Sequence, residues 1–291
     1  MTSVTNIPIA HWNQQCPTEV QENALRALEE GSVLFFPQLG FSVEETEAQF
    51  LSPNMSLKSK NISLDIGTGK LSGTSLDEAA VLPLQAMMQR FAKSSNDLIL
   101  SLLPHYKTGL IPGRTSFRPA EISGRSTSWR KDDTRLHVDS FPSSPVRDKR
   151  ILRVFANVNP LGRSRSWRLG ESFENVARRY LPSLRAPAWG SSQLLRLFRV
   201  TKSRRSAYDH FMLQLHDHMK ADLDYQSQAD QMTYDFPAGC AWMTFTDQVS
   251  HAAMAGQYVL EQTFYLPVAS MMNQSKSPLR VLERLTGRRL T

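Results

Sequence analysis

The spacing of apolar residues divides the chain into helical and strand-like segments. Helical spacing predicts helices over residues 18–30 and 81–104, the second as one long helix or two, and the buried strand SVLFFPQL follows the first helix. From Thr115 onwards, short strand-like runs alternate with Gly, Ser, Pro and basic clusters. Helical spacing returns over about 171–230, and strands resume with MTYDF, CAWMTF and YVLEQTFYLPV. This order is typical of a β-sandwich or jelly roll that carries a helical insertion.

We therefore predict a single domain over residues 1–291 that is mainly β with added α-helices. Its core would comprise about 115–170 and 231–270, with the helical insertion of about 171–230 between them and a basic segment at 278–291. Single β-sandwich domains often exceed 200 residues, so the length fits one domain. Apolar residues make up 41% of the chain, which is enough to bury a sizeable core.

The run Arg135-Leu136-His137-Val138-Asp139 holds the candidate chemistry. On a strand, successive side chains point to opposite faces, so His137 and Asp139 would share one face and Leu136 and Val138 the other. An imidazole and a carboxylate on one face are two thirds of the 2-His-1-carboxylate triad that binds Fe(II). His251, surrounded by small residues after the second group of strands, is our third candidate ligand. Three protein ligands leave open positions for an oxoacid and O₂.

Other sites compete poorly with this triad. A single His-x-Asp run is a weak signal, and a histidine in a strand is more often a hydrogen-bonded structural residue. His216 and His218 lie in a helical pattern, where two positions turn about 200°, so we expect them to diverge and to face solvent or a helix flank. His11, His105 and His210 have no partner at ligand spacing, and the sequence contains no GxSxG, GxGxxG or Walker loop.

An oxoacid that chelates iron at one end needs a basic group for its distal carboxylate. Arg153, on the next predicted strand, could bind that carboxylate through two hydrogen bonds, and Arg118 in TSFRP is the rival. Gln262 and Thr263, on the last long strand, could line the same pocket.

On these residues the chain resembles the Fe(II)/2-oxoglutarate dioxygenase superfamily. The block from RTSFRPAEISG through TRLHVDSF and RVFANVNP to WRLGESFE is similar to the bacterial Kdo 3-hydroxylases, as are LEEGSVLFFPQLGFS and FPAGCAWMTFTDQVSHAAMAGQ. The resemblance implies a double-stranded β-helix (jelly roll), with N-terminal helices and a helical insertion between the two metal-binding strands. It implies hydroxylation at C3 of Kdo in Kdo-lipid A, giving Ko, with Fe(II), 2-oxoglutarate and O₂. Many members carry an Arg shortly after the distal His, but QYVLEQTFYLP has none, which favours Arg153 as the anchor.

The formal charge of +7 bears on the partner. Basic residues crowd around the proposed metal strand and would steer an anionic glycolipid such as Kdo-lipid A, namely Arg125, Arg130, Lys131, Arg135, Arg147, Lys149, Arg150, Arg163 and Arg165. Among them we take Arg125, Arg130, Lys131, Arg135 and Arg150 as substrate contacts. Two alternatives stay open: a 2-oxoglutarate oxygenase acting on nucleic acid or protein, and a non-catalytic sugar-binding jelly roll. Aromatic residues among the basic ones are sparse, so we expect no nucleic acid.

The location follows from what the sequence lacks. It shows no signal peptide, no apolar run long enough to span a bilayer and only two distant cysteines. We expect a cytoplasmic protein that contacts the inner face of the bacterial inner membrane peripherally; its oligomeric state cannot be predicted. In residues 278–291, Leu279, Leu282 and Leu285 form an apolar stripe. The stripe could face a membrane surface or pack on the core of the domain.

Overall fold

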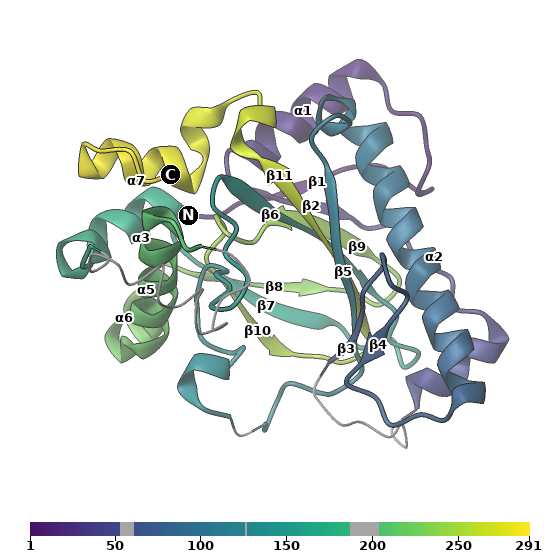
Figure 1. Cartoon of the computed structure of the whole chain (residues 1–291). Coiled ribbons are helices and arrows are strands. Elements are labelled where there is room, and N and C mark those ends of the chain that lie inside the picture. The colour runs from purple at the N-terminus through teal and green to yellow at the C-terminus, as the bar shows by residue number, and fades with distance from the viewer. Residues whose placement is uncertain (53–60, 126, 187–203) are drawn as a thin grey trace.

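The computed structural model describes residues 1–52, 61–125, 127–186 and 204–291 (Figure 1). An eight-stranded sheet has the order β1-β2-β9-β6-β11-β5-β3-β4, and a three-stranded sheet has the order β10-β7-β8. All pairs are antiparallel except β1 with β2. The strands are β1 (Val4–Asn6), β2 (Val33–Phe36), β3 (Ile62–Leu64), β4 (Leu71–Ser72), β5 (Ile111–Arg118), β6 (Lys149–Asn157), β7 (Arg165–Leu169), β8 (Met232–Phe236), β9 (Ala241–Phe245), β10 (His251–Ala255) and β11 (Val259–Pro267).

Two N-terminal helices cover the outer face of the large sheet. The α-helices in the described residues are α1 (Thr18–Glu29), α2 (Glu78–Leu102), α3 (Phe173–Tyr180), α5 (Ala207–Ala221), α6 (Leu223–Gln228) and α7 (Pro278–Thr286). In α2, Leu84, Met87, Met88 and Phe91 are fully buried at helical spacing and pack in the core cluster with the sheet. The helices predicted over 18–30 and 81–104 are therefore confirmed, the second as one continuous helix whose cap is Asp77.

Side chains along β6 alternate between two hydrophobic cores, one on each face of the large sheet. Leu152 and Val154 point to the side of α1 and α2, whereas Arg153 and Phe155 point to the other face. Phe155 stacks on Trp242 with ring centroids 5.1 Å apart, and Trp167 of the small sheet meets Phe155 edge-on at 5.2 Å. These aromatic rings fill the space between the two sheets and leave the polar side chains further along the strands to surround a cavity.

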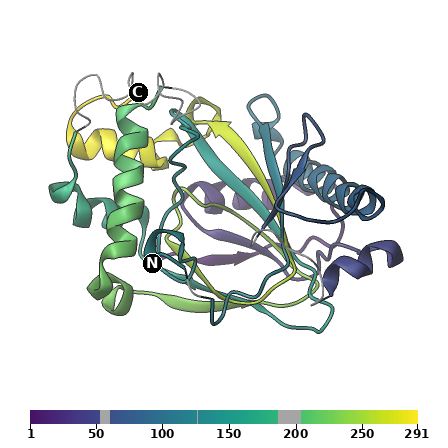
Figure 2. The same ribbon diagram turned by 60° about the horizontal axis from the view of Figure 1, so that its bottom comes forward.

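The remaining helices gather on the side of the sheets opposite α2, as Figures 1 and 2 both show. Helices α3, α5 and α6 lie between β7 and β8 in the chain. Their apolar side chains form a cluster that also contains Leu136 and Val138. This packing places the helices directly behind the segment that carries His137 and Asp139.

The C-terminal helix packs on the same cluster. Leu279 and Leu282 of α7 are 1% and 0% exposed, and Arg284 forms an ion pair with Glu174 of α3 at 2.8 Å. The apolar stripe of this helix therefore covers the core of the domain and does not face a membrane. Within the described parts of the chain, no helix is long and apolar enough to cross a bilayer.

Truncation of this stripe tests the packing. We expect Leu282→Ala to lower the free energy of unfolding by about 2–5 kcal/mol, because it removes fully buried methyl groups and leaves a cavity. Arg289→Ala, on the exposed end of the chain, is the control and should change it by less than about 0.5 kcal/mol. Urea unfolding followed by circular dichroism measures both. Equal stability of the two variants would mean that α7 does not pack in solution.

Candidate active site

Backbone pairing brings two distant histidines together. The N–H of His137 donates to the carbonyl of His251 at 3.0 Å, and the N–H of His251 donates back at 2.9 Å. The N–H of Asp139 donates to the carbonyl of Thr246 at 2.8 Å. The strand expected over Arg135–Asp139 is thus reduced to a single β-bridge at His137, because the flanking contacts are out of register: the N–H of Ala253 in β10 donates to the carbonyl of Asp133 at 2.8 Å, and Asp139 pairs with Thr246. The expected alternation still holds, since Leu136 and Val138 are fully buried on the opposite side.

Both imidazoles have a fixed tautomer. Nδ1 of His137 lies 2.7 Å from the carbonyl of Arg135, and Nδ1 of His251 lies 2.8 Å from the carbonyl of Val249. A carbonyl only accepts, so each Nδ1 carries the proton and each Nε2 keeps its lone pair for a metal. Trp167 stacks on the ring of His251 at 5.0 Å between centroids and restricts its rotation.

The third group completes a compact set of ligands. Nε2 of His137 and Oδ1 of Asp139 are 3.7 Å apart, and the ligand atoms of His137, Asp139 and His251 lie within 4.8 Å of one another. The three residues are 8%, 9% and 6% exposed. Two imidazole nitrogens and one carboxylate oxygen on one side of a cavity fit a mononuclear Fe(II) ion with open coordination positions.

The electrostatic environment keeps the groups in the states a metal needs. Burial lowers the pKa of both histidines, and the neighbouring imidazole of His251 lowers the pKa of His137 further, so both rings are neutral near pH 7. Burial alone would raise the pKa of Asp139, but Arg153 and the two histidines together hold it below its ordinary range. The site therefore presents two neutral donors and one carboxylate.

A cavity of about 160 Å³ adjoins these ligands. Three arginines line it, Arg118 from β5, Arg153 from β6 and Arg165 from β7. The other lining residues are Asn61, Asp133, Phe155, Trp167, Ala253, Val259 and Glu261. A cavity of this size holds one small molecule, and its three arginines come from three different strands.

The arginines and carboxylates of the cavity form a connected network. Nη1 of Arg153 lies 3.1 Å from Oδ2 of Asp139 and 3.5 Å from Glu261, and Nη2 of Arg118 lies 2.5 Å from Glu261. Arg153 thus contacts the carboxylate oxygen that does not face His137, which leaves Oδ1 of Asp139 for the metal.

Arg165 is the cavity residue that the sequence did not single out as an oxoacid anchor. It is 3% exposed, and its Nη1 donates to the carbonyl of Gly256 at 2.7 Å. Burial and the nearby Arg118 lower its pKa to about 9, so it is still charged near neutral pH. Side chains alternate along β7, so Arg165 lies on the same face as Trp167. This two-residue repeat was the sequence signal that could have identified Arg165 as a cavity residue.

The two candidates on β11 lie on opposite faces. Thr263 is opposite Arg153 in the strand register and shares its face, although it does not line the cavity. Gln262 points the other way, where it accepts a hydrogen bond from Thr115 at 2.6 Å and donates to the carbonyl of Thr263 at 2.7 Å. The expectation that Gln262 lines the pocket is therefore wrong, because adjacent strand residues cannot share one face.

Arg150 is not available to a substrate. It is 0% exposed and donates to both carboxylate oxygens of Asp247 at 2.7 and 3.2 Å and to Gln248 at 2.7 Å. Its guanidinium lies 3.9 Å from the ring centroid of Phe245. Arg150 is three positions from Arg153 on β6, so it points to the opposite face and belongs to the core beside α1 and α2.

The other predicted substrate contacts occupy three kinds of position. Arg125 pairs with the cavity residue Asp133 at 2.8 Å. Arg135 donates to the carbonyl of Lys220 at 2.7 Å and has a structural role. Lys131 is exposed, and Arg130 lines a second, larger pocket of about 770 Å³ next to α3 and α5.

His216 was expected to face solvent or a helix flank, and of these two positions the structure excludes the solvent-facing one. Its ring meets the ring of His137 edge-on with centroids 5.4 Å apart, and its side chain is 14% exposed. His218 does diverge from it and bonds to Ser183 at 3.0 Å beside the larger pocket. The sequence could establish that the two rings diverge, but it could not establish which side of α5 meets the metal site.

Comparisons with known proteins agree with this geometry. Residues 11–289 match the family model of 3-deoxy-D-manno-oct-2-ulosonic acid (Kdo) hydroxylase. A solved structure of the Kdo hydroxylase KdoO, a non-haem Fe(II) α-ketoglutarate-dependent dioxygenase in complex with α-ketoglutarate and Fe(III), is 46% identical, with a TM-score of 0.96 over 100% of this chain and 98% of that one. The cobalt(II) complex of KdoO is 47% identical, with a TM-score of 0.97 over 99% and 97% of the two chains. No curated protein sequence matches the chain. With nearly its whole length matched, the chain belongs to the Kdo hydroxylase family.

Proposed function

We propose that this protein hydroxylates C3 of a Kdo residue on lipid A and so converts it to Ko. The observation that carries the proposal is the buried triad of His137, Asp139 and His251 beside an arginine-lined cavity, in a chain of the Kdo hydroxylase family. The alternatives, an oxygenase acting on nucleic acid or protein and a non-catalytic sugar-binding jelly roll, do not fit this family.

The protein is an Fe(II)/2-oxoglutarate-dependent dioxygenase, like the relatives that it matches over its full length. When bound, the iron supplies the oxidative chemistry that couples 2-oxoglutarate and O₂ to hydroxylation of a C–H bond. The side chains of the protein hold the reactants in place. His137, Asp139 and His251 would bind the metal, and the aromatic layer of Phe155, Trp167 and Trp242 would exclude water from one end of the cavity.

The strand order supports a double-stranded β-helix as the detailed fold. Strands β9, β6, β11 and β5 form the centre of the large sheet, and the bridge at His137 adds that segment to the small sheet beside β10, β7 and β8. Each sheet thereby receives four segments, and the chain alternates between the two sheets except at β7 and β8, which are consecutive strands of the small sheet. Helices α3, α5 and α6 would then be an insertion between the two metal-binding segments.

Charge balance supports 2-oxoglutarate binding at the three arginines. Arg118, Arg153 and Arg165 face three carboxylates that line the same cavity, from Asp133, Asp139 and Glu261. A divalent metal at the triad would leave an excess of two positive charges in a buried space, and the dianion 2-oxoglutarate neutralises that excess. Arg153, which contacts Asp139, would lie nearest the metal, with Arg118 and Arg165 completing the anion site. Thr263, beside Arg153, would support it without direct contact.

Substrate approach would use the basic residues outside the cavity. Arg125, Arg130 and Lys131 lie on the segment that leads to His137, and a polyanion such as Kdo-lipid A would be attracted to them. We propose that the enzyme works peripherally at the inner face of the bacterial inner membrane. Since α7 buries its leucines, any membrane contact would come from other parts of the surface.

A product assay tests the proposed reaction. With Fe(II), 2-oxoglutarate and O₂, we expect mass spectrometry to find one added oxygen on Kdo-lipid A, and tandem fragmentation to place it on C3 of Kdo. His251→Ala is the control that should give no product. Consumption of 2-oxoglutarate without any oxygen gained by Kdo-lipid A, under conditions where the protein is loaded with iron, would contradict this substrate.

Metal binding can be measured apart from turnover. We expect the metal-free protein to bind one Co(II) per chain with a visible absorption band, and His251→Ala to lose most of this affinity because only two ligands remain. His105→Ala is the matched control, since His105 is exposed and far from the triad in the sequence, and its binding should equal that of the wild type. Full Co(II) affinity in His251→Ala would remove His251 from the site.

Steady-state kinetics can rank the contributions of the cavity arginines to 2-oxoglutarate binding. Loss of a charge-assisted hydrogen bond costs about 1.5–3 kcal/mol, so we expect Arg153→Ala and Arg165→Ala each to raise the KM for 2-oxoglutarate by about 10- to 100-fold. Arg163→Ala, at an exposed position two residues before β7, is the control and should leave the KM unchanged. An unchanged KM in Arg165→Ala would leave the anion to Arg118 and Arg153.

A further inference from the structure

The segment that carries His137 and Asp139 has an edge that no strand covers in the described parts of the chain. His137 directs its own N–H and C=O toward β10. In extended backbone the groups of the preceding residue point the opposite way, so the N–H and C=O of Leu136 face the helices. These two groups are buried with Leu136, which is 0% exposed, and buried backbone groups need partners.

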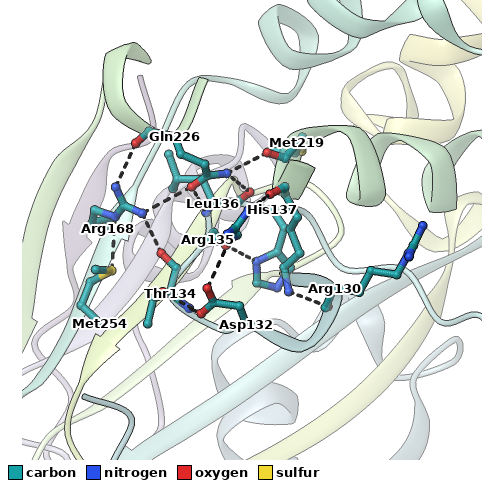
Figure 3. Close-up of polar contacts among 11 residues, drawn as sticks. Arg130, Asp132, Thr134, Arg135, Leu136, His137, Arg168, Met219, Gln226 and Met254 are labelled. Carbon is teal, nitrogen blue, oxygen red and sulfur yellow. Dashed lines mark hydrogen bonds and ion pairs between the residues drawn. The ribbon is translucent and has the colours of Figure 1, made fainter. Parts of the chain in front are cut away.

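One side chain supplies both partners. The amide of Gln226, at the end of α6, accepts a hydrogen bond from the N–H of Leu136 at 2.7 Å and donates to the carbonyl of Leu136 at 3.0 Å, as Figure 3 shows. Its nitrogen also donates to the carbonyl of Met219 in α5 at 2.8 Å. A carboxamide has the same donor and acceptor as a peptide group, so Gln226 pairs with Leu136 as a neighbouring strand would.

The peptide between Arg135 and Leu136, which Gln226 binds, also orients the metal ligand His137. The N–H of Leu136 and the carbonyl of Arg135 belong to a single planar peptide unit. Gln226 accepts a hydrogen bond from the N–H of this unit. The carbonyl of the same unit, which belongs to Arg135, accepts a hydrogen bond from Nδ1 of His137 at 2.7 Å. A continuous relay therefore runs from the Gln226 oxygen through one peptide plane to the imidazole, whose Nε2 faces the other ligands. Hydrogen bonds in such a chain polarise one another, so the relay also makes Nε2 of His137 a better electron-pair donor to a metal.

Two arginines fix the relay to its surroundings. Arg168 of β7 donates to the carbonyl of Thr134 at 2.6 Å and to the backbone carbonyl of Gln226 at 3.1 Å. Arg135 donates to the carbonyl of Lys220 in α5 at 2.7 Å. Figure 3 shows these contacts on the side of the segment that faces α5 and α6. The helices are thus joined to the metal-binding segment through polar contacts as well as through packing of Leu136.

We infer that Gln226 is a positioning residue for the metal centre, which acts on His137 through the peptide between Arg135 and Leu136. The inference rests on the proposed metal site. It assigns the helices between β7 and β8 a direct part in metal binding, because they supply the amide that replaces a neighbouring strand. Gln226 does not line the cavity, and its amide bonds to Leu136 and Met219 rather than to a metal ligand, so its loss should act on metal affinity through the orientation and polarisation of His137.

The test is Co(II) titration of the metal-free protein, which needs no turnover. Loss of a group that orients a metal ligand typically weakens binding 10- to 100-fold, so we expect Gln226→Leu to raise the Kd for Co(II) by that factor. Gln231→Leu is the matched control. Its amide accepts a hydrogen bond from Arg168 at 3.0 Å and donates to the carbonyl of Gln226 at 3.3 Å, but it does not touch residues 134–139. We expect its Kd to stay within about twofold of the wild type.

A conservative variant separates the relay from general packing. Gln226→Glu keeps an acceptor for the N–H of Leu136 but loses the amide donor to the carbonyls of Leu136 and Met219. We expect its Kd for Co(II) to lie closer to the wild type than that of Gln226→Leu, even where both variants melt at lower temperature. Equal weakening in the two variants, or a Kd within about twofold of the wild type in Gln226→Leu, would overturn the inference.

Hydrogen exchange on the unaltered protein tests the same contact should Gln226→Leu fail to fold. The amide of Leu136 should be strongly protected in the metal-free wild type, and rapid exchange would overturn the inference. Co(II) binding by the wild type and by His251→Ala distinguishes failure of the proposed metal site from failure of the proposed role of Gln226. If the wild type binds no Co(II) through the triad, the metal site itself is wrong. If the wild type binds but Gln226→Leu binds equally well, only the role of Gln226 is wrong.

Discussion

The reciprocal backbone hydrogen bonds between His137 and His251 are the constraint on which the site depends. They are short and paired, so they fix both the separation and the relative orientation of two residues from distant parts of the chain. Side-chain geometry follows from this pairing, because each imidazole donates its Nδ1 proton to a carbonyl two residues earlier and so directs Nε2 to the same point. Asp139 joins them by donating its N–H to the carbonyl of Thr246, the residue that follows β9.

Charge is the second constraint, and it acts on the cavity as a whole. Buried guanidinium and carboxylate groups are costly unless they are paired, and here each arginine is within reach of a carboxylate or a carbonyl. The three arginines and three carboxylates that line the cavity balance one another, so a dication and a dianion keep this balance only if both are bound. Metal and oxoacid are therefore expected to stabilise one another in this space, since either alone leaves net charge in a cavity of about 160 Å³.

Strand alternation explains which site residues the sequence could predict. It placed His137 and Asp139 on one face correctly because their side chains alternate with Leu136 and Val138. The same rule, applied to the arginines, would have separated Arg150 from Arg153 and pointed to Arg165 beside Trp167. Other positions depended on tertiary structure. The side of α5 that meets His137 is set by how the helix packs, so the approach of His216 could not be read from a helical period, and the apolar stripe of α7 fitted a core as well as a membrane.

Gln226 of α6 shows why a side chain is a useful substitute for a strand at this edge. A further strand would need several residues in register and would fix the chain that follows it, whereas a single amide satisfies both backbone groups of Leu136. One side of α5 supplies His216 against His137 and the carbonyls of Met219 and Lys220, while Leu213 and Asp217 on another side line the pocket of about 770 Å³. One helix can thus hold the metal-binding segment in place on one side while its other side lines the larger pocket.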